Sequence, residues 1–78
     1  MKKHKLSDLT PGEKAIISVC NHDYFDDPRL SEMGVVEGTE VQFIKRAPLG
    51  DPIQLKLRGY FLSIRHKDAQ QIEVEKVA

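Results

Sequence analysis

The chain has 78 residues, with 12 basic and 12 acidic side chains and one cysteine, Cys20. A chain of this length forms one small domain, which we expect over residues 1–78, and leaves little room for a deep catalytic site. Balanced charge removes the broad attraction to phosphates that a general nucleic-acid-binding protein needs. One cysteine allows no internal disulfide, and the start MKKHKL lacks the apolar stretch of a secretory signal, so we expect a cytoplasmic protein.

The first predicted strand is residues 14–20, KAIISVC, because the run is rich in β-branched side chains. A short turn at residues 7–9 precedes it, and a polar loop with two aromatic side chains follows at residues 21–27. Side chains alternate between the two faces of a strand. The wholly apolar face is the predicted core face and consists of Ala15, Ile17 and Val19.

Residues 27–34, DPRLSEMG, have the start and stop signals of one short helix. The Asp-Pro pair suits an N-cap followed by the first helical position, and Gly34 suits the left-handed residue that ends a helix. Leu30 and Met33 lie three apart on one face. Both could plug the core, or one of them could face the groove of a partner protein.

The second half of the chain predicts four further strands, at residues 40–46, 53–58, 60–65 and from Ile72 onward. A turn at Gly38 precedes them, and residues 66–71 fit a single helical turn. Five short strands with one or two short helices predict a mainly β fold, a small partly open SH3-like barrel, because closure hides strand edges. A five-stranded oligonucleotide-binding barrel is the alternative, but it typically needs longer loops.

Residues 47–65 form the most informative segment, a predicted hairpin preceded by the turn sequence PLGDP. Apolar alternation permits two registers, with either Gly59 and Tyr60 or Arg58 and Gly59 as the central residues of the turn. The sequence does not choose between them. Leu49 stands on the turn between two prolines, which predicts a preorganised apolar contact of the kind that marks an interface.

These segments together resemble the FeoA family of small cytosolic proteins of bacterial ferrous iron uptake. The resemblance is carried by the helix ending in Met33 and Gly34, the turn at Gly38, the PLGDP tip, the RGY step at Arg58, and the arginine before a DA turn at Arg65, Asp68 and Ala69. It implies an SH3-like barrel and a role beside FeoB, a membrane transporter for ferrous iron with a cytosolic GTP-binding domain. We therefore expect a non-enzymatic accessory protein that binds or modulates this transporter.

The predicted partner-binding residues are Leu30, Met33, Leu49, Arg58 and Tyr60. Self-association through a barrel edge is left open. No nucleic-acid partner is expected. The alternative function is a small nucleic-acid-binding barrel, which would need a basic stripe including Arg46, Lys56 and Arg65, with Phe61 on the outward side. Acidic Glu73 and Glu75 dilute this stripe. Arg29, Arg58 and Arg65 could also serve a partner GTPase as an arginine finger, but ordinary solvated side chains explain them more simply.

A metal hypothesis rests on Cys20, His22 and Asp23. Cys20 and His22 are two residues apart and share a face if the strand continues, and carboxylates follow in the loop. These ligands form no repeated motif and select no one metal, so no firm cofactor is expected and a transition metal ion is the candidate. The competing interpretation is a solvated loop whose Asp27 caps a helix. No sequence motif for nucleophilic or phosphate-cradling catalysis is present.

Overall fold

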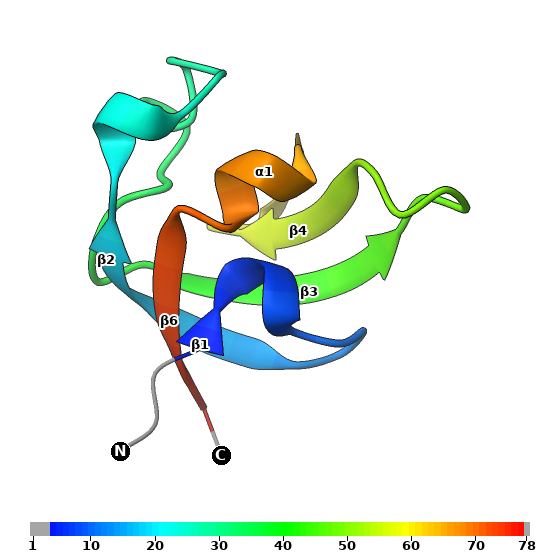
Figure 1. Cartoon of the computed structure of the whole chain (residues 1–78). Coiled ribbons are helices and arrows are strands. Elements are labelled where there is room, and N and C mark those ends of the chain that lie inside the picture. Colours follow the sequence, from blue (N-terminus) through cyan, green and yellow to red (C-terminus); the bar gives the residue numbers. More distant parts are fainter. Residues whose placement is uncertain (1–3, 78) are drawn as a thin grey trace.

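The computed structural model describes residues 4–77, which form one antiparallel sheet of six strands in the order β1-β6-β2-β3-β4-β5. The strands are β1 His4–Lys5, β2 Lys14–Cys20, β3 Glu40–Arg46, β4 Ile53–Leu57, β5 Tyr60–Ile64 and β6 Ile72–Lys76. Three short helical pieces connect them: the 3-10 turns η1 Leu6–Asp8 and η2 His22–Tyr24, and the helix α1 His66–Ala69. Figure 1 shows a curved, partly open barrel with α1 against the sheet.

A single apolar cluster fills the barrel and takes side chains from every strand from β2 to β6. Ala15 and Ile17 of the predicted core face are buried, as expected. Val19 is only half-buried because the pairing of β2 with β6 shifts register between Ile17 and Val19. Such a bulge breaks the alternation of faces. No helix among residues 4–77 has the length and apolar character needed to cross a membrane.

The hairpin of β4 and β5 adopts the second of the two permitted registers. Leu57 pairs with Tyr60, and Leu55 pairs with Leu62, so Arg58 and Gly59 are the central residues of the turn. Both have positive φ, 50° at Arg58 and 84° at Gly59. Two consecutive left-handed residues are the geometry of a type I′ turn, whose twist matches that of the flanking strands.

The helix predicted at residues 27–34 is wrong, because the segment forms consecutive hydrogen-bonded turns instead. Both predicted end signals are present: Asp27 Oδ1 accepts the backbone N–H of Arg29 at 3.0 Å, and Gly34 has φ of 104°. The N–H of Val35 donates to Leu30 O, and that of Gly34 to Ser31 O, which is a Schellman end. Between the two caps only the N–H of Met33 donates to the carbonyl four residues earlier, that of Arg29, so the repeated bonds of an α-helix do not form in this segment.

The N-terminal strand β1 was not predicted. It has two residues, too few for any alternation to show, and pairs with β6 through His4 and Val74. The turn predicted at residues 7–9 is η1, which buries Leu6. The predicted domain also includes residues 1–3 and 78, which lie outside the described residues.

Candidate protein-interaction site

The turn between β3 and β4 projects from the barrel as a free tip, residues 47–52, seen at the right of Figure 1. The N–H of Gly50 donates to Ala47 O at 2.8 Å, and the N–H of Ala47 donates to Pro52 O at 3.0 Å, so the tip is closed by its own backbone. Leu49 is 97% exposed. The structure therefore holds this leucine in water on a defined turn, as the sequence predicted.

The turn between β4 and β5 is docked on the protein itself. The hydroxyl of Tyr60 donates a hydrogen bond to the backbone carbonyl of Met33. Arg58 lies over Gly34, where a Cβ would be 3.2 Å from its Cδ and Nε atoms. Met33, Arg58 and Tyr60 thus form one surface, which we call the docked-turn surface. Three of the five predicted partner-binding residues come together here, and Leu49 lies apart on the free tip.

Leu30 is a core residue and not an exposed contact residue. Only 1% of the residue is exposed, and it packs in the core cluster. The Schellman end of its segment turns this side chain into the barrel, so the prediction that it faces a partner is corrected. Tyr60 is 37% exposed, although it shares a face of β5 with the buried Leu62 and Ile64.

Of the three predicted metal ligands, Cys20 and His22 share one contact, but the three are not assembled into a site. The Sγ of Cys20 and the Nε2 of His22 both approach the backbone carbonyl oxygen of Val35, at 3.7 and 3.4 Å. Burial, with a smaller contribution from Glu37, raises the pKa of the Cys20 thiol to about 11. Within residues 4–77 no group of three or more potential ligands gathers around one point. The metal hypothesis stays a prediction.

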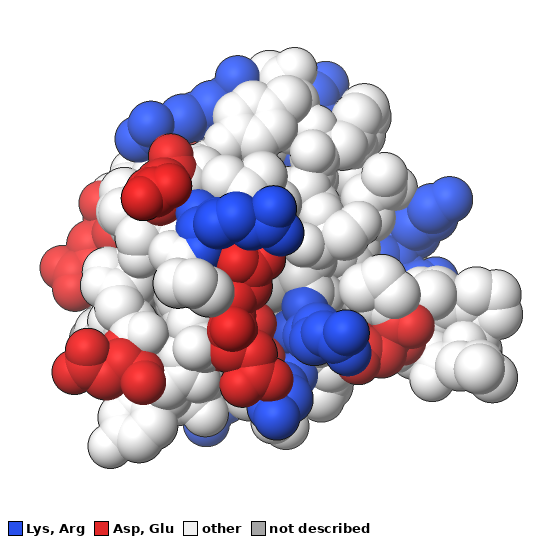
Figure 2. Space-filling view, turned by 90° about the horizontal axis from the view of Figure 1, so that it is seen from above, with Lys and Arg blue, Asp and Glu red and all other residues white. Residues whose placement is uncertain are grey.

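Part of the predicted basic stripe serves the fold. Arg46 donates to the backbone carbonyls of Ser7 and Leu9, and its guanidinium lies 4.9 Å from the centroid of the Phe43 ring. Figure 2 shows charges of both signs interspersed on one face of the molecule, without a continuous basic band. The uncharged protrusion at the right of this view is the outer part of the free tip. This face therefore lacks the continuous positive charge with which proteins bind a phosphate backbone.

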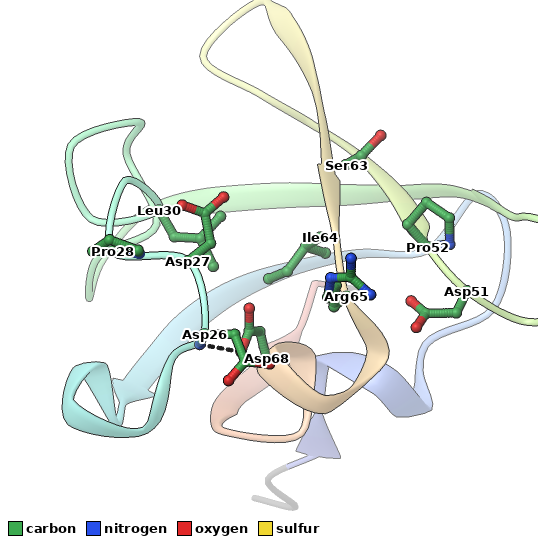
Figure 3. A pocket seen from close by; sticks show the side chains of 10 residues that line it. All are labelled: Asp26, Asp27, Pro28, Leu30, Asp51, Pro52, Ser63, Ile64, Arg65 and Asp68. Atoms are coloured by element: carbon green, nitrogen blue, oxygen red, sulfur yellow. Dashed lines mark hydrogen bonds between the residues drawn. The ribbon is translucent and has the colours of Figure 1, made fainter.

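Sequence reasoning missed a pocket of about 460 Å³ between the end of β5 and residues 26–30. Figure 3 shows carboxylates from three separate segments around it, with Arg65 between them. They are Asp26, Asp27, Asp51 and Asp68. No sequence signal could have revealed the pocket, because its members approach only through the fold of the barrel.

Comparisons with known proteins decide the family. The model of the FeoA domain matches residues 4–76. The chain belongs to the FeoA domain family. It is also 35% identical, over 74 residues, to the Fe(2+) transport protein A/Fe(2+) transporter FeoB fusion protein of Porphyromonas gingivalis. That match covers 95% of this chain but only 9% of the much longer fusion protein.

Solved FeoA structures have the same fold. The NMR structure of an FeoA-like protein from Clostridium acetobutylicum is 35% identical, with a TM-score of 0.87 over 100% of this chain and 91% of that one. The zinc complex of Stenotrophomonas maltophilia FeoA, described as a prokaryotic SH3 domain protein, is 25% identical, with a TM-score of 0.75 over 92% of this chain and 89% of that one. The predicted FeoA resemblance and the SH3-like barrel are confirmed.

Proposed function

We propose that this FeoA domain is a small non-catalytic accessory protein of ferrous iron uptake, which binds an FeoB-type transporter on the cytosolic side of the membrane. The observation that supports the proposal is the fusion protein, in which a domain like this one is part of the same chain as the transporter. Tethering keeps two partners at high local concentration. Two separate chains must achieve the same association through a contact surface.

The free tip is the proposed centre of that contact. Leu49 is 97% exposed, and the two backbone hydrogen bonds of the tip fix it in place. A preorganised apolar side chain loses little conformational entropy when it binds, so more of its burial energy contributes to affinity. The docked-turn surface is the second candidate, since Met33 and Tyr60 expose apolar atoms beside the charged Arg58.

The proposal is tested by titrating the whole chain into the cytosolic domain of an FeoB-type transporter and measuring affinity by calorimetry. We expect binding by the wild type, and a loss of about tenfold or more for Leu49→Glu, the effect typical of a central contact residue. Val77→Glu is the matched control, because Val77 is also apolar and 42% exposed but lies outside the tip. Absence of wild-type binding would overturn the proposal; equal binding by Leu49→Glu would move the contact away from the tip.

A further inference from the structure

The pocket beside β5 contains a carboxylate whose hydrogen bonding is incomplete. Asp68 is 1% exposed. Its Oδ1 accepts the backbone N–H of Asp26 at 2.8 Å, which ties residues 26–30 to α1. Its Oδ2 is buried and has no hydrogen-bond partner within residues 4–77. Leaving a buried charged oxygen without a donor is costly, and a donor supplied from outside would remove that cost.

The charged side chains around Asp68 determine whether the pocket favours a positively or a negatively charged ligand. Four carboxylates line the pocket, against one guanidinium, that of Arg65. Two of the four have surface ion pairs: Asp26 with Lys67 at 2.9 Å and Asp27 with Arg29 at 3.2 Å. Arg65 is exposed and forms no ion pair in the described part of the chain. The lining therefore keeps an excess of negative charge, which favours a cation.

Apolar side chains complete the wall of the pocket. Leu30 and Ile64 lie beside it, and Pro28 and Pro52 lie at its two sides (Figure 3). A lysine or arginine side chain has an apolar stem and a charged end, and it buries the stem along apolar surface while the end reaches polar groups. Apolar walls leading to a carboxylate match that side chain better than they match a bare metal ion. Consistent with this, the described residues offer no group of ligands for a metal.

The strand beside the pocket has a free edge. Within residues 4–77, β5 is the last strand of the sheet and pairs with β4 alone. Because Leu57 and Tyr60 close the two-residue turn, alternate pairs such as Lys56 with Phe61 and Gln54 with Ser63 direct the N–H and C=O groups of Phe61 and Ser63 away from β4. Ser63 also lines the pocket. A free edge of this kind accepts an extended polypeptide as an added strand.

We propose that the pocket binds a lysine or arginine side chain of a partner polypeptide that lies extended along β5, with the cationic end donating to Asp68 Oδ2. The free edge supplies backbone hydrogen bonds, and the pocket supplies selection for a basic residue. This goes beyond the proposed function, since it names a peptide-binding site and requires no contact between the free tip and a transporter.

The test uses the full chain, labelled with 15N, and the blocked peptide acetyl-Val-Thr-Arg-Thr-Val-amide as probe. We expect saturable shifts of the amide signals of Phe61, Ser63 and Asp68. Replacing the peptide's arginine with citrulline, which removes the charge and keeps the shape, should weaken binding about tenfold or more. Asp68→Asn should do the same, while Asp23→Asn, an exposed aspartate outside the pocket, should bind as the wild type does.

Equal binding of the arginine and citrulline peptides, full binding by Asp68→Asn, or no shifts at all would overturn the proposal; the last result would mean that water alone fills the pocket. Asp68→Asn also alters the acceptor of the Asp26 N–H, so a second variant is used. Ser63→Lys adds a positive charge at an exposed position on the rim and should abolish binding with the fold intact. Wild-type affinity in Ser63→Lys would contradict the proposal. Neither measurement involves a transporter, so this test and that of the proposed function can fail separately.

Discussion

The two ends of β4 carry turns that share a left-handed glycine but have opposite environments. Both contain a glycine with positive φ, 91° at Gly50 and 84° at Gly59. The first turn is the free tip, with Leu49 in water, whereas the second is docked through Tyr60 and Arg58 onto residues 33 and 34. The difference comes from what lies opposite each turn. Residues 27–34 fold over the docked turn. At the other end of β4 the backbone N–H of His66 donates to Asp51 at 2.9 Å, and Leu49 beyond it stays exposed.

The largest expected effect is a difference in stability between two leucine variants. One leucine lies in the segment that supports the docked turn, and the other lies on the free tip. Leu30 is 1% exposed and Leu49 is 97% exposed, so the same substitution should have opposite consequences. Leu30→Ala should lower the free energy of unfolding by about 2–5 kcal/mol, because it leaves a cavity in the core. Leu49→Ala should change it by less than about 0.5 kcal/mol. Urea unfolding of both variants measures the change in unfolding free energy. Equal losses would contradict the assignment of Leu30 to the core and of Leu49 to the solvent.

A second pair of variants tests the close approach at the docked turn. Gly34 and Gly50 both have positive φ, so alanine at either position costs about 1–2 kcal/mol in backbone strain. At Gly34 the new Cβ would also lie 3.2 Å from the Arg58 side chain, whereas at Gly50 it would meet nothing within 4 Å. Gly34→Ala should therefore destabilise more than Gly50→Ala in thermal unfolding. Adding Arg58→Ala to Gly34→Ala should recover part of this additional loss of stability. If the additional loss persists unchanged, the contact between residue 34 and the Arg58 side chain is contradicted.

Local chemistry predicted most of the fold. The bounds of β2 and β3 match the predicted residues 14–20 and 40–46, because β-branched and alternating side chains report directly on a half-buried strand. Prediction failed where a strand is very short or where its pairing with another strand determines which side chains are buried. The two residues of β1 are too few to show a period, and the bulge in β2 depends on its partner β6. The segment at 27–34 carried both cap signals, but caps do not supply the helical turns between them.

The candidate sites were less predictable, because exposure depends on distant segments. Leu49 was found from its position between two prolines, whereas Leu30 and Met33 looked alike in sequence and differ in burial. The contact of Tyr60 with Met33 joins residues from two different parts of the chain. Asp68 appeared in the sequence only as part of a family motif. Its unpartnered oxygen is a property of packing, which no local pattern encodes.

A smaller effect measures the hydrogen bond that closes the docked turn. Tyr60→Phe removes the hydroxyl that donates to Met33 O and keeps the ring. The expected loss is about 0.5–1.5 kcal/mol, the net value of one hydrogen bond in a folded protein. Thermal unfolding measures it, with Tyr24→Phe as the control because Tyr24 is 71% exposed. Equal effects of the two variants would show that the bond does not hold the turn.

The smallest expected change in stability concerns a third turn, residues 10–13. This turn is stabilised by the interactions of a charged carboxylate, that of Glu13. The carboxylate of Glu13 accepts the backbone N–H of Thr10 at 2.7 Å and lies 3.0 Å from the Lys76 ammonium. The Thr10 hydrogen bond, followed by Lys76, lowers the pKa of Glu13 from 4.5 to about 2.

A carboxylate with a depressed pKa stabilises the fold above its unfolded pKa, and this contribution is lost as the pH falls toward the folded pKa. Glu13→Gln should therefore melt at a lower temperature than the wild type above pH 4.5, and the gap should shrink between pH 4.5 and 2. The exposed Glu32→Gln serves as control. A gap that stays constant across this range would mean that the turn is held by neutral hydrogen bonds, in the way that the free tip is held by its backbone.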